Sequence, residues 1–153
     1  MRKLWVLFLA LPTLPMSAEF RQVEIKVSGL ECVSCAESLP KTLERMRGVE
    51  SATMDPKAGL VVVKLKTGNK LPLEDLRDKL KQAGYTPGDA KVNAVGAMVL
   101  EEGKWRFRPA GINHAYLAEL PASVKPVADQ PVEVEGTIAS DILKVGVVRK
   151  AIP

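Results

Sequence analysis

The chain has 153 residues, of which 46% are hydrophobic, 26% charged and 5% aromatic. This composition excludes an intrinsically disordered chain and is typical of one medium-sized or two small globular domains with aliphatic cores. The 22 lysines and arginines exceed the 18 acidic residues, but the two signs are interspersed without a basic stripe, which argues against a nucleic-acid-binding surface.

The first eighteen residues have the organisation of a signal peptide. A basic start, residues 1–3, precedes an apolar run over residues 4–14 that is too short for a stable membrane span. Small residues then offer a cleavage site after Ala18. We therefore expect export, to a bacterial periplasm. The alternative is an uncleaved N-terminal anchor, because Pro12 and Pro15 blur the cleavage region.

Residues 19–91 alternate between strand and helix patterns. Period-two and helical spacings of apolar residues predict a strand over 21–27, a helix over 35–47, strands over 49–55 and 60–66, a helix over 73–83, and a return to the sheet over 85–92. This order predicts an α+β, ferredoxin-like βαββαβ domain in which two helices cover one face of a four-stranded antiparallel sheet. Pro40 interrupts the first helical pattern, so that helix is either kinked there or begins later than Cys35.

Residues 92–153 carry strand patterns only. Short strands are expected over 92–100, 105–108, 115–120, 132–138 and 142–150, with a proline-rich loop over 121–131. Five strands in about sixty residues predict a small all-β domain, either an OB-like barrel or a curled sheet. The ending VEVEGTI…ILKVGVVRKA resembles the small OB-like modules of exported bacterial proteins.

Cys32 and Cys35 are the two cysteines of the chain. A disulfide between them would close a very small loop and stabilise the fold little, so a chemical role is favoured over a structural one. Thiolates prefer soft cations, and two of them suffice for Cu(I) or Hg(II). Zn(II) usually requires four protein ligands, and only His114 and carboxylates would remain to complete such a site.

The predicted positions of the two cysteines favour an open site. Cys35 is expected near the start of a helix, where unpaired N–H groups and the helix dipole favour a thiolate. Cys32 is expected on the preceding loop, after the turn at Gly29. A site with one ligand on a loop and one on a helix could pass its ion on by ligand exchange, one thiolate at a time.

Several separated motifs resemble the heavy-metal-associated domain of copper chaperones, metal-pumping ATPases and the periplasmic mercuric-ion-binding protein. The matching residues within 20–91 are Gly29, Cys32, Cys35, Ala36, Gly48, Val49, Ala83, Gly84 and Tyr85. The resemblance implies a ferredoxin-like fold and a metal ion carried by the two cysteines without catalysis. A membrane metal transporter or pump is a candidate partner, which the second domain would dock while the first domain delivers or senses the ion. We expect a monomer with no nucleic-acid partner.

Two departures from the family pattern bear on the choice of metal. Leu30 stands where the family usually has methionine, and it should serve as an apolar substitute. Glu31 is a candidate third ligand that would shift preference towards Zn(II), Cd(II) or Pb(II); the alternative is a solvated loop glutamate. Tyr85 is expected either near the site or as a packing residue at the sheet edge.

A thiol–disulfide oxidoreductase that uses Cys32 and Cys35 is the alternative function. The residues between the cysteines, Val33 and Ser34, are not of the type usual in such enzymes, and no tryptophan precedes Cys32. The order of elements after the motif also differs from the thioredoxin pattern. These observations favour a carrier.

The histidine, the methionines and the aromatic and basic residues over 105–108 are expected to have structural roles rather than to form a site. His114, the single histidine, is expected on a surface loop of the second domain. Met46, Met54 and Met98 are scattered and are expected to fill the core. Alternation of core-facing and solvent-facing positions accounts for the aromatic and basic residues over 105–108.

Overall fold

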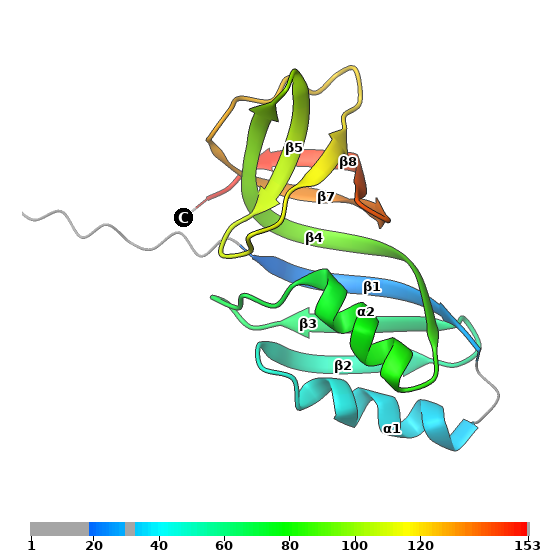
Figure 1. Cartoon of the computed structure of the whole chain (residues 1–153). Coiled ribbons are helices and arrows are strands. Elements are labelled where there is room, and N and C mark those ends of the chain that lie inside the picture. The colour runs from blue at the N-terminus through cyan, green and yellow to red at the C-terminus, as the bar shows by residue number, and fades with distance from the viewer. Residues whose placement is uncertain (1–18, 30–32, 153) are drawn as a thin grey trace, which may run out of the picture.

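A computed structural model of the chain describes residues 19–29 and 33–152. The elements, in chain order, are β1 (Phe20–Ser28), α1 (Val33–Glu44), β2 (Val49–Asp55), β3 (Leu60–Leu65), α2 (Leu73–Gln82), β4 (Thr86–Glu101), β5 (Lys104–Pro109), β6 (Tyr116–Glu119), β7 (Pro131–Ala139) and β8 (Ile142–Lys150). The predicted α+β class and the βαββαβ order of the first part are confirmed, and strands follow them (Figure 1).

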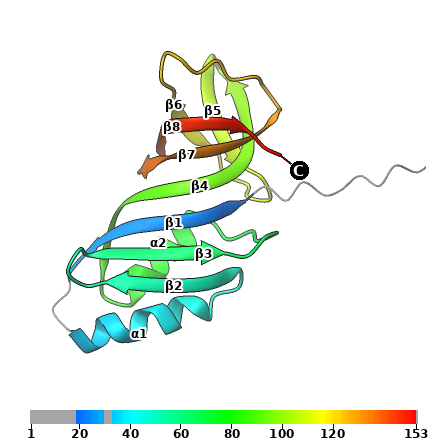
Figure 2. The ribbon, with the colours of Figure 1, turned by 180° about the vertical axis from the view of Figure 1, so that it is seen from behind.

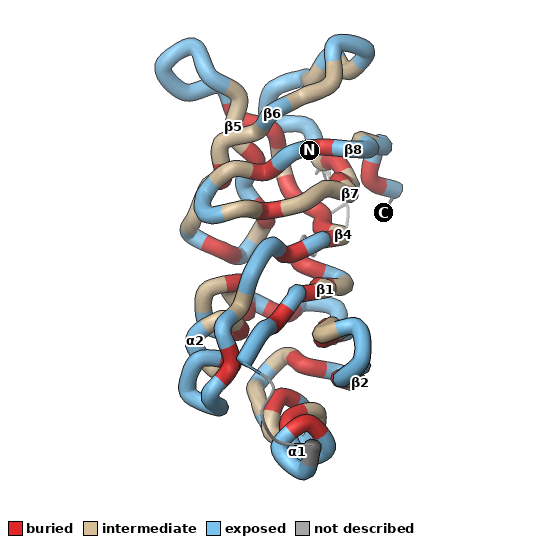
Figure 3. The backbone as a smooth tube through the Cα atoms, turned by 90° about the vertical axis from the view of Figure 1, so that its right-hand side faces the viewer, coloured by how far each residue is buried: buried red, intermediate tan, exposed pale blue. Residues whose placement is uncertain are grey.

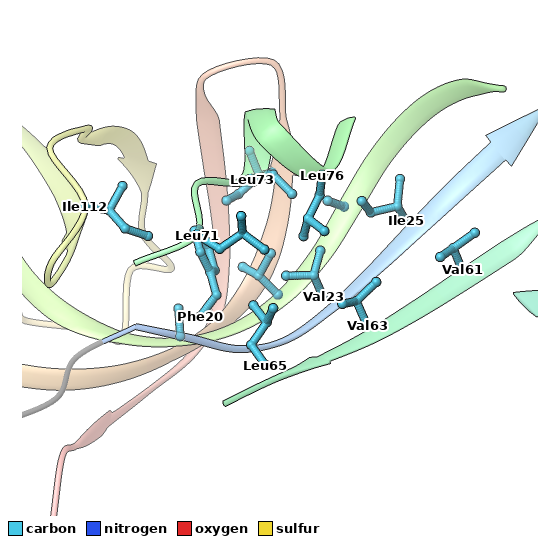
Figure 4. Packing of buried hydrophobic residues seen from close by; sticks show 14 of the residues in the cluster. Phe20, Val23, Ile25, Val61, Val63, Leu65, Leu71, Leu73, Leu76 and Ile112 are labelled. Carbon is cyan, nitrogen blue, oxygen red and sulfur yellow. The ribbon is translucent and has the colours of Figure 1, made fainter. Parts of the chain in front are cut away.

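The first part is an antiparallel sheet in the order β2-β3-β1-β4. Strand β1 buries alternate side chains, Val23, Ile25 and Val27, because successive residues of a strand point to opposite faces. Leu73 and Leu76 of α2 pack against this buried face, as Figure 4 shows. Figure 1 shows α2 lying across the sheet, and Figure 2 shows the same layers from behind.

Helix α1 departs from the prediction at both ends. It begins at Val33, so the predicted alternative of a start later than Cys35 is wrong, and Pro40 lies inside the helix. Proline donates no backbone hydrogen bond, so the carbonyl of Ala36 loses its usual helical donor. The helix ends at Glu44, and the chain turns back to β2 through Gly48, whose φ is +99°.

Strand β4 corrects the prediction of two separate strands that meet near residue 92. It is one strand of 16 residues, and it pairs with β1 over its first part, with β7 over 90–97 and with β5 over 96–101. A Cβ at Gly96 would collide with the carbonyl oxygen of Arg108. Glycine there lets β4 approach β5 closely as it curves out of the first sheet, a path that Figure 1 shows.

The last five strands pair in a closed cycle. Strand β4 pairs with β5, β5 with β6, β6 with β8, β8 with β7, and β7 with β4 again; the β6–β8 pair is parallel and the others are antiparallel. Figure 3 shows buried residues along these strands, in red, and exposed residues in the loops that join them, in pale blue. Within residues 92–152 the structure has no helix.

The two parts share one hydrophobic core. Phe20 of β1 and Tyr116 of β6 belong to the same buried cluster, and their rings meet edge to face with centroids 6.3 Å apart. Arg77 of α2 donates a hydrogen bond of 3.1 Å to the carbonyl of Ile138 in β7. The strands after β4 are therefore packed against α2 and β1. None of the helices in the described residues is long and apolar enough to cross a membrane.

Candidate metal centre

The end of β1 and the end of α2 lie side by side. Ser28, the last residue of β1, pairs with Thr86, the first residue of β4. Gly29 follows with φ +86°, and a Cβ there would lie 3.5 Å from the carbonyl oxygen of Gly84. Figure 1 shows the end of β1, the start of α1 and the end of α2 at the same end of the molecule.

Two backbone hydrogen bonds terminate α2 and fix the position of Tyr85. The backbone N–H of Tyr85 bonds to the carbonyl of Leu80, and that of Gly84 bonds to the carbonyl of Lys81, both at 3.0 Å. With Gly84 at φ +92°, this is the Schellman arrangement that terminates many helices. Tyr85 is then 6% exposed and belongs to the hydrophobic core.

Cys35 lies in the first turn of α1, as predicted, and is exposed. Its carbonyl accepts a hydrogen bond of 3.0 Å from Oγ of Ser38, and the carbonyl of Ser38 accepts one of 3.2 Å from Oγ1 of Thr42. The first turn contains no acidic residue. The partial positive charge of a helix start therefore acts on Cys35 without a neighbouring carboxylate in that turn to offset it.

The remaining predicted site residues, Cys32 and Glu31, lie outside the described residues, as does Leu30. The pairing of Cys32 with Cys35 around a metal ion, and the role of Glu31 as a third ligand, stay predictions. Among residues 19–29 and 33–152, no group of three or more histidine, cysteine and acidic side chains is arranged to hold a metal ion.

Cys35 opens onto a groove of about 400 Å³ between the two helices. The groove is lined by Cys35, Ser38, Leu39 and Thr42 from α1, and by Lys79, Gln82, Ala83 and Tyr85 from α2 and its end. Tyr85 therefore packs in the core and also lines the groove onto which Cys35 opens.

The groove between α1 and α2 was not predicted from the sequence. The spacing of Cys35, Ser38 and Thr42 places these residues on one face of α1, which a helical projection could have shown. The contribution of Lys79 and Gln82 could not have been found in this way, because it depends on how α2 packs beside α1.

His114 lies in the second part of the chain, where its Nε2 is 3.2 Å from Oδ1 of Asp141 and its side chain is 42% exposed. The prediction of a loop position is confirmed. Met98 is fully buried, and Met46 and Met54 pack against the core, so the prediction of core-filling methionines is also confirmed. In β5, Phe107 is buried between the partly exposed Arg106 and the exposed Arg108, as alternation predicts.

Comparison with known families identifies the domain type of the first part of the chain. Residues 24–86 match the sequence model of the heavy-metal-associated domain. The chain contains a heavy-metal-associated domain. The match spans the loop after β1, the start of α1 and the groove, and the described strands after β4 lie outside it. No curated protein matches the chain.

Several solved structures are similar to the heavy-metal-associated domain. The CopZ metallochaperone is 26% identical, and the similarity covers 43% of this chain and 97% of that one, with a TM-score of 0.40. A copper-binding domain from HMA7, a P-type ATPase, is 24% identical over 47% of this chain and 92% of that one, with a TM-score of 0.40. The yeast copper transporter domain Ccc2a is 18% identical over 44% of this chain and 90% of that one, also with a TM-score of 0.40.

Proposed function

We propose that this protein is a non-catalytic carrier of a soft heavy-metal ion, held by the thiolates of Cys32 and Cys35. The observation that carries the proposal is that both cysteines fall within the heavy-metal-associated match, with Cys35 exposed in the first turn of α1. An exposed thiolate on a helix start can be reached by the ligands of an acceptor, so transfer proceeds by exchange of one thiolate at a time.

The ion we propose is Cu(I) or Hg(II). Two thiolates can satisfy either ion, whereas Zn(II) usually requires four protein ligands. Zn(II) and Cd(II) become competitive if Glu31 adds a carboxylate to the site. Glu31 directly precedes Cys32 in the chain, which is why we propose it as the residue that tunes the choice of ion.

Export to the periplasm and delivery to a membrane metal transporter or pump are part of the same proposal. Export rests on the basic, apolar and small-residue order of residues 1–18. Delivery to a transporter rests on the family, whose modules occur in metal-pumping ATPases as well as in carriers.

We also propose that residues 92–153 form an OB-like barrel, a second domain beside residues 19–91. The closed cycle of strand pairs from β4 through β5, β6, β8 and β7 supports this proposal. Strand β4 runs through the proposed boundary and is shared by both parts. On this proposal the barrel is attached through β4, at the edge of the first sheet. It leaves the start of α1, where Cys35 lies, and the end of α2 accessible.

The experiment that tests the function is titration of the reduced protein with Cu(I), Hg(II) and Zn(II), each against a competing chelator. We expect tight binding of Cu(I) and Hg(II), and a Glu31→Gln variant weakened towards divalent ions that use carboxylates but not towards Cu(I). If the chain instead binds no soft ion and reduces disulfides efficiently in an exchange assay, the carrier proposal is wrong and the oxidoreductase alternative replaces it.

A further inference from the structure

Two loops at one end of the heavy-metal-associated domain carry basic residues and no acidic ones. Residues 45–48, between α1 and β2, contain two arginines, and residues 66–72, between β3 and α2, contain two lysines. Figure 1 shows both loops at the end of the domain opposite to the start of α1 and the end of α2. We call these loops the basic end; its cations are Arg45, Arg47, Lys66 and Lys70.

Backbone contacts hold the two loops of the basic end against each other. The N–H of Lys66 donates a hydrogen bond of 2.8 Å to the carbonyl of Gly48, and a Cβ at Gly48 would lie 3.0 Å from the Cβ of Asn69. The side-chain amide of Asn69 is buried and donates to the carbonyls of Lys66 and Phe20, at 2.8 and 2.9 Å. The two loops are therefore held together and beside the start of β1.

A surface cavity of about 650 Å³ lies between these loops. Its charged lining residues are Arg47, Lys66, Lys70 and Asp75. The three cations are exposed, and none of them forms an ion pair within the described residues, whereas Lys81 of α2 does. Three positive charges against one negative charge favour an anionic partner at this surface.

Both ends of the described chain lie on the same side of the molecule as the basic end. The carbonyl of Glu19 accepts a hydrogen bond of 2.9 Å from the N–H of Val95, and Val95 shares a small buried cluster with Ala151. The next residue, Ile152, is 85% exposed. Figures 1 and 2 both show the start of β1 and the end of β8 on this side. An exposed aliphatic side chain thus accompanies the cations.

The sequence before Glu19 indicates which anionic partner this side meets. The apolar run over residues 4–14 ends five residues before Glu19, a separation that an extended chain spans in at most about 18 Å. While that run lies in a bilayer, the basic end is within reach of the lipid headgroups. Anionic phospholipids attract lysine and arginine close to a membrane surface, and an apolar side chain can enter the headgroup region. A soluble anion would give no use to the exposed isoleucine.

We propose that the basic end docks on an anionic phospholipid surface, with Arg47, Lys66 and Lys70 against the lipid phosphates. The inference does not depend on which ion the protein carries. The start of α1, with Cys35, lies at the opposite end of the domain and then faces away from the bilayer. Once residues 1–18 are removed, the contact rests chiefly on charge, so it is reversible and weakens as the salt concentration rises.

Co-sedimentation with vesicles tests the proposal. The protein is purified in its exported form, and mass spectrometry establishes its N-terminal residue, so that wild type and variants are compared in the same form. Vesicles of phosphatidylcholine alone are compared with vesicles that also contain phosphatidylglycerol. We expect tighter binding to the anionic vesicles, and loss of this difference at high salt. Equal binding to the two kinds of vesicle, or binding to neither, would overturn the inference.

Two charge-matched double variants locate the contact. Lys66→Gln/Lys70→Gln should weaken binding to the anionic vesicles by roughly 25-fold, because each cation near the membrane surface contributes about a factor of five. Lys26→Gln/Lys57→Gln removes the same charge from exposed side chains at the opposite end of the domain, and should change binding little. If both variants weaken binding to the same extent, net charge alone acts and the docking surface is wrongly assigned.

Glycerol phosphate distinguishes a soluble anion from a membrane. Its binding is followed by NMR shifts of the amides of Gly68 and Lys70, and we expect it to bind much more weakly than the anionic vesicles. If glycerol phosphate binds there and the vesicles do not, the cavity takes a soluble anion and the docking proposal is wrong. Cu(I) retention in the Lys66→Gln/Lys70→Gln variant should equal that of the wild type. Failure of docking would therefore leave the proposed function standing, and failure of the wild type to retain Cu(I) would remove the proposed function alone.

Discussion

The phenol of Tyr116 in β6 donates a hydrogen bond to Oε2 of Glu74 in α2, with an oxygen–oxygen distance of 3.1 Å. The other carboxylate oxygen of Glu74 lies 3.6 Å from Nη1 of Arg77, and Arg77 in turn bonds to the carbonyl of Ile138. A helix of the heavy-metal-associated domain is thus tied to two of the strands that follow it.

Replacement of Tyr116 by phenylalanine should weaken this tie. The ring is fully buried, so Tyr116→Phe keeps the packing and removes one hydrogen bond, at a cost of about 1 kcal/mol in the free energy of unfolding. Urea denaturation followed by circular dichroism measures the change. A variant as stable as the wild type would show that the Glu74 contact contributes nothing.

The same residue should make stability sensitive to alkaline pH. Burial and then the Glu74 carboxylate raise the pKa of Tyr116. The folded state therefore favours the neutral phenol, and this contribution is complete below the ordinary tyrosine pKa of about 10 and is lost as the pH rises above it. We expect the wild type to lose stability faster than Tyr116→Phe above pH 10, by up to about 1.4 kcal/mol per pH unit. Parallel slopes of the two proteins would contradict the assignment.

The whole chain after residue 19 should unfold in one transition. The two parts share a core, and β4 supplies strand pairs to both, so neither can unfold without exposing apolar surface of the other. Thermal unfolding followed by far-ultraviolet circular dichroism and by tryptophan fluorescence of Trp105 should give coincident midpoints. Separate midpoints would mean that the parts are independent.

Gly96 should tolerate a side chain less well than Gly146, another strand glycine. A Cβ there would collide with the carbonyl of Arg108 and lie 2.9 Å from the ring of Phe107, so Gly96→Ala should cost about 1–3 kcal/mol through overpacking. Gly146→Ala is the matched control, because its Cβ would lie 3.4 Å from its nearest neighbour, the carbonyl oxygen of Glu135. Equal losses of stability in the two variants would remove the packing explanation.

Pro40 should be a point of low stability within α1. Pro40→Ala restores a backbone donor for the carbonyl of Ala36, and the gain in helix stability could reach about 3 kcal/mol. Hydrogen exchange should then show stronger protection of the amides between Cys35 and Leu43. If protection and stability are unchanged, the helix accommodates the proline without cost.

Much of the fold could be predicted from local pattern. The strands β2 and β8 have the predicted bounds, and the family match confirms the heavy-metal-associated domain. The continuity of β4 was missed, because its buried positions change from alternating to consecutive around Ala94 and Val95, where pairing with β1 ends and pairing with β5 begins. Strand β7, which pairs with β4 over residues 90–97, also lies some forty residues later in the chain.

The candidate site was likewise predicted only in part from the sequence. The exposed position of Cys35 on a helix start follows from local sequence signals, namely the turn at Gly29 and the helical spacing after the cysteines. The position of Lys79 in the groove does not follow from such signals, because it requires two helices that are separated by 28 residues to lie together. Long-range packing is therefore what the sequence pattern left undetermined.

The central claim is that the two cysteines together hold the ion. Its most direct measurement is the amount of Cu(I) retained per chain against a competing chelator, for the wild type, Cys32→Ser, Cys35→Ser and the neighbouring control Ser34→Ala. We predict one Cu(I) per chain in the wild type and in Ser34→Ala, and loss of retention in both cysteine variants. Retention by either cysteine variant at the affinity of the wild type would contradict the account.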